Sequence, residues 1–152
     1  MDYIDFVSLK ITRKKRTKQF DMNILGVPGA GRFFQKMIGN SDREIFAFVG
    51  LDITGKINCY AVSHIGTLNQ TSIHPREIFK YSILSNSNSI IIAHNHPSGR
   101  LIPSNEDISI TEKLVNAGKL IGIEIVDHLI VSESEYLSVR EQSASLFSEY
   151  KK

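Results

Sequence analysis

The chain has 152 residues, which is enough for one domain with a single core. Its hydrophobic fraction of 41% and charged fraction of 22% are those of an ordinary globular protein. No apolar run approaches the roughly 20 residues that span a bilayer, and residues 1–5 lack the pattern of a signal peptide. A single cysteine, Cys59, excludes an intrachain disulfide. We therefore expect a cytoplasmic protein with no membrane partner.

The charge is unevenly distributed along the chain. The formal net charge is +2, yet residues 10–18 hold six basic side chains and no acidic one. Such a run can attract phosphates, which makes Lys14, Lys15 and Arg16 candidate nucleic-acid contacts. A short basic run is also typical of a solvated N-terminal arm or hairpin turn, and we favour this simpler interpretation.

The first half of the chain predicts a hairpin preceded by a short helix. Residues 44–51 are rich in Ile, Phe and Val and predict a strand, 52–55 a turn, and 56–65 the returning strand. Before them, loose alternation over residues 4–11 predicts a first strand. The glycine-rich residues 26–31 predict a turn, and 32–38 the end of a short helix.

The second half alternates helices with strands. The predicted elements are a helix from Pro75 to about Asn86, a buried strand over 89–94, a helix over 107–117 ended by Gly118 or Gly122, a strand over 121–131, and a short final helix beginning over 133–137. This order predicts an α/β fold with a mixed sheet flanked by helices. We divide the chain into an N-terminal segment, 1–39, a main domain, 40–140, and a frayed tail, 141–152.

The most informative stretch runs from residue 94 to residue 107. His94 and His96 end a predicted strand at a spacing that points both side chains to the same side. Pro97, Gly99 and Pro103 then turn the chain, and Asp107 falls in the first turn of a predicted helix. Two imidazoles and one carboxylate brought together in this way could bind Zn²⁺ and leave its fourth position open for water.

Each of these residues also has a simpler interpretation. A single histidine is more often structural than a metal ligand, although two on one face beside such a loop are harder to dismiss. Ser104 and Asp107 have the spacing of a capping box, which taken alone is the more common meaning of that pattern. The two interpretations of Asp107 are compatible, because the cap would fix where its carboxylate points.

A hydrolytic zinc site also needs a general base for the bound water. Glutamate is the usual carboxylate for that role. Composition and spacing do not select one among five candidates: Glu44, Glu77, Glu106, Glu112 and Glu124.

The spacing His94-x-His96-Pro97, six residues, Ser104-x-x-Asp107 resembles the JAMM (MPN+) motif of the JAB metallo-isopeptidase family. Further segments resemble the bacterial RadC branch of that family. They are His-Asn-His-Pro-Ser-Gly at 94–99, Pro-Ser at 103–104, Asp-His-Leu-Ile-Val at 127–131, Gly-Thr-Leu-Asn at 66–69 and His-Pro-Arg-Glu at 74–77. The resemblance covers about residues 40–131.

The resemblance implies a single-domain MPN/JAB fold of the cytidine-deaminase-like kind and zinc bound by His94, His96 and Asp107. It also implies that Glu44, in the context Arg-Glu-Ile-Phe, is the general base, and that Ser104 helps to hold the developing oxyanion. Long RadC proteins carry an N-terminal helix-hairpin-helix module, and we expect no room for one before residue 40. Direct binding of duplex DNA is therefore in doubt.

We thus expect a zinc metallohydrolase that acts on a protein or peptide substrate, at a main-chain peptide or a lysine isopeptide bond. The alternative is an accessory factor in DNA repair or for a mobile element, in contact with DNA or DNA-processing proteins. A non-catalytic MPN scaffold ranks last, because no part of the ligand set is missing. For Asp127 and His128 two interpretations stay open. They support the metal ligands from behind or contact a substrate groove, or they form a structural pair at a strand end that hydrogen-bonds the backbone. The oligomeric state is open.

Overall fold

The computed structural model describes residues 4–12, 26–69 and 72–148. Its helices and strands follow one another in the order α1 (Gly26–Ile38), β1 (Ile45–Leu51), β2 (Ile57–Ile65), α2 (Pro75–Leu84), β3 (Ser89–Asn95), α3 (Asn105–Ile121), β4 (Glu124–Val131), β5 (Tyr136–Ser138), α4 (Val139–Gln142) and a 3₁₀ turn, η1 (Ala144–Phe147). Within these described ranges, no helix is both long and apolar enough to cross a membrane.

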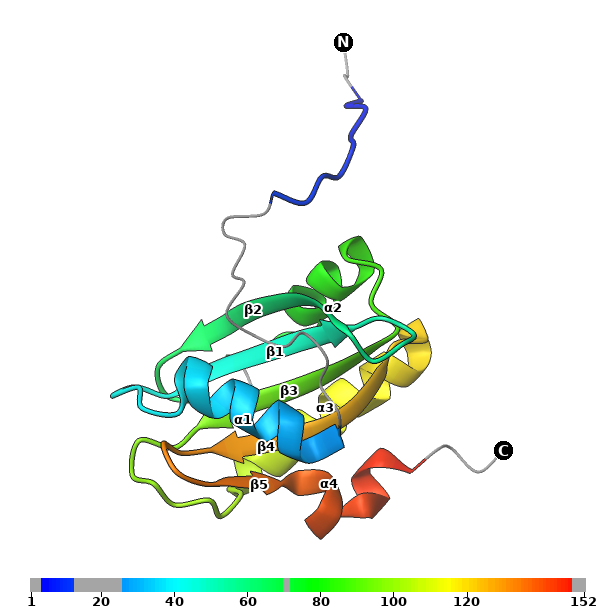
Figure 1. The fold of residues 1–152 in the computed structure, drawn as a ribbon. Coiled ribbons are helices and arrows are strands. Elements are labelled where there is room, and N and C mark those ends of the chain that lie inside the picture. Colours follow the sequence, from blue (N-terminus) through cyan, green and yellow to red (C-terminus); the bar gives the residue numbers. More distant parts are fainter. Residues whose placement is uncertain (1–3, 13–25, 70–71, 149–152) are drawn as a thin grey trace.

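The strands form one mixed sheet in the order β2-β1-β3-β4-β5 (Figure 1). The predicted hairpin is confirmed, because β1 pairs antiparallel with β2. On its other side β1 pairs antiparallel with β3, and β3 pairs parallel with β4. The parallel pair needs a crossover, which α3 supplies. The predicted α/β class with a mixed sheet is therefore correct.

Helices cover both faces of the sheet (Figure 1). On one face, α1 packs Ala30, Phe34 and Ile38 against the odd-numbered side chains of β1 and β3. On the other face, α2 and α3 pack against the even-numbered side chains of the same two strands. Because side chains alternate along a strand, His94 belongs to the face that α3 covers.

The glycine-rich residues 26–31 are helical, so the predicted turn is wrong. Glycine disfavours a helix intrinsically, but tertiary packing overrides that preference here. Gly31 lies against the ring of Tyr136 on β5, and a Cβ at this position would come within 2.5 Å of the ring. The missing side chain therefore lets α1 sit close to the sheet, where it buries its apolar face.

The short final helix is present as α4, but its predicted start over 133–137 is wrong, because α4 begins at Val139. Ser132 and Glu135 close a tight turn through backbone and hydroxyl hydrogen bonds, and the chain returns as β5 beside β4. Three residues are too few to show the alternation by which a strand is recognised. The expected frayed tail does not begin at residue 141 either, because η1 follows α4 and buries Phe147 in the core. Residues 149–152 lie outside the described part of the chain.

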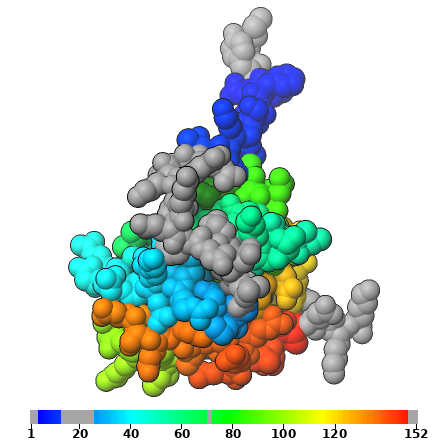
Figure 2. Space-filling model, in the orientation of Figure 1, coloured from blue at the N-terminus to red at the C-terminus, as the bar shows by residue number. Residues whose placement is uncertain are grey.

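The predicted strand over residues 4–11 does not form. These residues have no regular secondary structure, and Ile4, Phe6 and Leu9 are each at least 80% exposed. Figure 2 shows residues 4–12, in blue, standing apart from the body of the domain. The alternation of apolar and polar residues is typical of a strand, but it does not provide a neighbouring strand to pair with. A strand without such a neighbour is not stable in water.

Asp127 joins the C-terminal elements to the sheet. Its carboxylate accepts hydrogen bonds from the Ser138 hydroxyl at 2.6 Å, from Arg140 N at 3.1 Å and from His128 N at 2.7 Å. Burial raises the pKa of Asp127, and these three donors oppose that rise. Asp127 is therefore a structural anchor for β5 and α4.

We expect Asp127→Ala to lower the free energy of unfolding by about 3 kcal/mol, because a buried donor that loses its acceptor costs about 1–3 kcal/mol. Chemical denaturation measures the change. Asp52→Ala is the matched control. The Asp52 carboxylate also accepts several bonds, from Thr54 and Lys56, but in a solvent-exposed turn where water can replace it. Equal losses in the two variants would contradict the anchoring role.

Candidate metal centre

Three side chains from the second half of the chain converge at one end of the sheet. His94 is the penultimate residue of β3, His96 follows that strand, and Asp107 lies in the first turn of α3. The two imidazole Nε2 atoms are 2.9 Å apart. Asp107 Oδ1 is 3.2 Å from His94 Nε2, and Asp107 Oδ2 is 3.5 Å from His96 Nε2. The structure thus brings together all three residues that the sequence suggested as metal ligands.

The capping box at the start of α3 fixes the carboxylate of Asp107. Ser104 Oγ accepts a hydrogen bond from Asp107 N at 3.1 Å, and Ser104 N donates to Asp107 Oδ2 at 2.7 Å. The predicted capping box is therefore present, and it leaves Asp107 in position to be the predicted metal ligand. The side chain completes the cap and also faces the two imidazoles.

Electrostatics tie the three groups together. Burial by itself raises the pKa of Asp107, but hydrogen bonds with His94 and His96 outweigh it and hold that pKa well below its ordinary value. The bond to Asp107 likewise raises the pKa of His96 above its ordinary value of 6.5. Asp107 is therefore negatively charged and stabilises a positive charge beside it, such as a proton on His96.

The donor atoms fit a metal ion. His96 Nδ1 lies 2.5 Å from the carbonyl oxygen of Arg100, which can only accept, so Nδ1 carries a proton and donates it. His94 Nδ1 is likewise occupied, by a bond of 2.8 Å to His128. The Nε2 atoms of both rings therefore remain to meet the carboxylate, within a cluster whose ligand atoms all lie within 4.8 Å of one another. His94, His96 and Asp107 could hold a metal ion.

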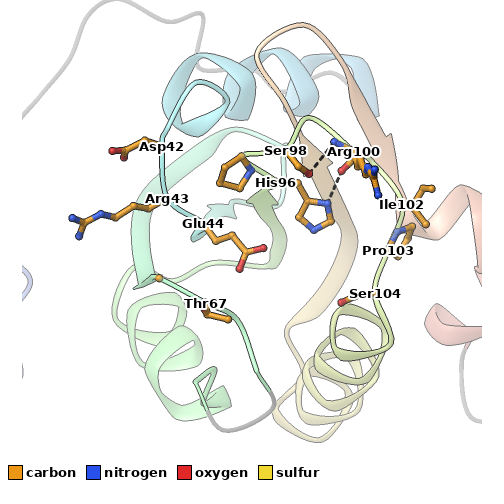
Figure 3. Close-up of a pocket in the computed structure, with 12 residues that line it drawn as sticks. Asp42, Arg43, Glu44, Thr67, His96, Ser98, Arg100, Ile102, Pro103 and Ser104 are labelled. Carbon is orange, nitrogen blue, oxygen red and sulfur yellow. Dashed lines mark hydrogen bonds between the residues drawn. The ribbon is translucent and has the colours of Figure 1, made fainter.

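A cleft of about 720 Å³ opens beside this cluster (Figure 3). The side chain of His96 is 14% exposed, whereas those of His94 and Asp107 are 0% and 3% exposed. The cluster is therefore accessible to solvent mainly at His96. Glu44 and Ser104 line the same cleft from opposite walls.

Glu44 precedes β1, and its carboxylate points into the cleft toward His96 (Figure 3). The backbone fixes it at two points. Gly66 N donates to the Glu44 carbonyl oxygen at 2.8 Å, and Leu68 N donates to Glu44 Oε2 at 3.1 Å. Its negative charge adds to the effects that raise the pKa of His96. None of the other glutamates considered above lines this cleft.

Asn95 is a site residue that sequence reasoning missed. It lies between the two histidines, is completely buried, and points to the opposite face of β3. Its Oδ1 accepts from Ile45 N at 2.7 Å, and its Nδ2 donates to the carbonyl oxygens of Arg43 at 2.9 Å and Ser41 at 3.3 Å. Asn95 therefore holds the segment that carries Glu44. The signal in the sequence that could have pointed to Asn95 is its position between His94 and His96.

Asp127 and His128 have different partners in the structure: His128 contacts a candidate metal ligand, and Asp127 contacts the C-terminal elements. His128 Nε2 is 2.8 Å from His94 Nδ1, so His128 lies directly behind the metal cluster. Asp127 bonds instead to Ser138 and Arg140, as described above. Neighbours on a strand point to opposite faces, which explains the division. Thr111, which bonds to His128 Nδ1 at 2.6 Å, was not singled out from the sequence.

A family model described as the RadC-like JAB domain matches residues 28–144. The chain belongs to this family. The match includes the three candidate metal ligands, every residue of the cleft walls described above, and most of α1, which lay outside the range of the sequence resemblance.

Relatives of this RadC-like domain occur in bacteria and archaea. A "UPF0758 protein" of Finegoldia magna is 40% identical over 135 residues, which is 89% of this chain and 60% of the relative. One of Latilactobacillus sakei is 38% identical over 130 residues, 86% of this chain and 58% of the relative. One of Methanosarcina acetivorans is 47% identical over 100 residues, 66% of this chain and 44% of the relative. The chain thus spans about half of these relatives' length.

The nucleic-acid contacts suggested by the sequence stay a prediction. Lys14, Lys15 and Arg16 lie outside the described residues.

The raised pKa of His96 predicts a pH dependence of stability. Folded His96 holds a proton that the unfolded chain releases near pH 6.5, so this contribution is complete below pH 6.5 and is lost as pH rises through the folded pKa. We expect the metal-free RadC-like domain to lose stability as the pH rises above about 6.5 and through the folded pKa of His96, and His96→Gln to abolish most of that loss.

A bound divalent ion should reverse the sign of this slope. The ion requires both imidazoles without a proton on Nε2, so its affinity rises with pH over the same range. Urea denaturation with chelator and with excess metal measures the two slopes. The same slope under both conditions would contradict the assignment of His96.

Proposed function

We propose that this RadC-like domain is a zinc-dependent hydrolase of peptide or isopeptide bonds. The observation that carries the proposal is the convergence of His94, His96 and Asp107 at a cleft that Glu44 and Ser104 also line. A ligand set of two imidazoles and one carboxylate is typical of catalytic zinc sites. The proposed substrate is a protein or peptide.

Zinc bound by these ligands would lower the pKa of a water molecule and polarise the carbonyl of a substrate amide. The three protein ligands leave a fourth position of a tetrahedral ion open. The exposure of His96 supports an open position on the cleft side, because His94 and Asp107 are closed off by protein.

Glu44 would act as the general base. The Leu68 N–H bond occupies Oε2, and Oε1 is then available to accept a proton from the attacking water. The water oxygen forms a bond to the amide carbon. Glu44 then returns the proton to the nitrogen as the carbon–nitrogen bond breaks, so the leaving group departs as a neutral amine.

Ser104 would stabilise the oxyanion of the tetrahedral intermediate. Its Oγ accepts a hydrogen bond from Asp107 N, which leaves the hydroxyl proton to be donated. Within the described part of the chain that proton has no acceptor. One such donor contributes about 3 kcal/mol to stabilising a transition state of this kind.

We expect Glu44→Gln to bind zinc as the wild type does and to hydrolyse its substrate at least about 10²-fold more slowly, because the amide cannot accept the proton. Elemental analysis and cleavage of peptide and isopeptide libraries measure the two properties. The control is Glu77→Gln, which changes an exposed glutamate paired with Lys80 on α2. Loss of zinc from Glu44→Gln would refute the base assignment. A wild-type chain that takes up no zinc would refute the proposal itself.

We expect Ser104→Ala to lower kcat by about 10²–10³-fold and to retain zinc, because it removes one oxyanion donor. The same change removes the helix cap and lowers stability by about 1 kcal/mol. Ser104→Thr keeps both the cap and the hydroxyl and should stay near wild-type activity. Kinetics at a temperature where all three proteins are folded separate the two effects. Equal kcat values for Ala and Thr would rule out the donor role.

A further inference from the structure

A chain of buried hydrogen bonds lies behind the metal cluster. Thr111 on α3, His128 on β4 and His94 on β3 are each 0% exposed. Thr111 Oγ1 is 2.6 Å from His128 Nδ1, and His128 Nε2 is 2.8 Å from His94 Nδ1. Thr111 Oγ1 is also 2.6 Å from the carbonyl oxygen of Asp107, one helical turn earlier. These hydrogen bonds therefore connect the imidazole of His94 to the backbone carbonyl of Asp107.

The single hydroxyl proton of Thr111 fixes the donor and the acceptor in the first two of these hydrogen bonds. A carbonyl oxygen only accepts, so the single hydroxyl proton of Thr111 must be donated to Asp107 O. Thr111 Oγ1 is then an acceptor toward the imidazole, and His128 Nδ1 must carry a proton. The opposite arrangement would leave two oxygens 2.6 Å apart with no proton between them.

The same logic continues to His94. His128 is completely buried, and a charged ring there would be desolvated beside another imidazole, so the ring is neutral and carries one proton. With that proton on Nδ1, His128 Nε2 is an acceptor. His94 Nδ1 must therefore donate to it, which leaves Nε2 as the nitrogen of that ring that faces the cluster and could bind a metal ion.

We propose that Thr111, acting through His128, is a positioning residue that fixes the tautomer of His94 needed for metal binding. The inference rests on the metal site of the proposed function. The other tautomer would place a proton on His94 Nε2, among atoms that lie 2.9 Å and 3.2 Å away in His96 and Asp107. That proton would occupy the direction of the metal bond. Helix α3 thus supplies one ligand directly and orients a second one across the sheet.

A purely structural role for Thr111 predicts something different. A threonine inside a helix often bonds its hydroxyl to the carbonyl four residues earlier, and that bond alone has no consequence for a distant histidine. Valine has nearly the same shape as threonine but can neither accept nor donate a hydrogen bond through its side chain. Serine keeps the hydroxyl and loses a methyl group. The pair Thr111→Val and Thr111→Ser therefore separates the hydroxyl from the packing.

The first measurement is the tautomer, in metal-free protein at neutral pH. Long-range ¹H–¹⁵N correlation spectra distinguish a protonated Nδ1 from a protonated Nε2 in each ring. We expect His128 to carry its proton on Nδ1 in the wild type and in Thr111→Ser, and a population with the proton on Nε2 to appear in Thr111→Val. A wild-type His128 protonated on Nε2 overturns the inference, whether or not the protein binds metal.

The second measurement is zinc affinity by competition with a chromogenic chelator, with thermal unfolding to identify folded variants. We expect Thr111→Val to bind zinc about 10–100-fold more weakly than the wild type, and Thr111→Ser to stay within about threefold of it. Zinc binding by Thr111→Val within about twofold of the wild type overturns the inference and leaves the proposed function standing. An equal loss in both variants also overturns it, because packing would then explain the effect.

Discussion

The domain is organised around one electrostatic constraint. Two imidazole nitrogens and one carboxylate meet in a space that is almost closed to water, and their unshared electron pairs need a positive charge between them. A buried carboxylate without a partner would be costly, which is why the pKa of Asp107 depends so strongly on the two rings. The strand, the loop and the helix that carry these groups must therefore be held in register with one another.

The fold meets this constraint with few parts. Strand β3 is central in the sheet and paired on both sides, so His94 is fixed by two neighbouring strands. The capping box sets the start of α3 and the direction of Asp107 with the same two hydrogen bonds. Behind them, Thr111 and His128 connect α3 to β3 through β4. His94 and Asp107 thus lie on regular elements, whereas His96 lies directly after β3 and Glu44 directly before β1.

The sequence predicted the parts of this arrangement that depend on local pattern. The β1–β2 hairpin, the buried strand β3, and the spacing of His94, His96 and Asp107 are all local, and each is found where it was expected. What escaped prediction depends on distant contacts. The helix at Gly26 needs the ring of Tyr136 to lie against Gly31, and the role of Thr111 needs a histidine 17 positions later in the chain. The apolar pattern of residues 4–11 carried no information about whether a partner strand exists.

Asn95 gives the site a further mechanical property. Its backbone lies between those of His94 and His96. Its side-chain amide hydrogen-bonds the backbone of three residues next to or near Glu44 in the sequence, namely Ser41, Arg43 and Ile45. Glu44 and the two histidines are therefore held by one hydrogen-bonded frame rather than by two separate ones. A displacement of the end of β3 would therefore move Glu44 together with the two histidines and change the distances between them little.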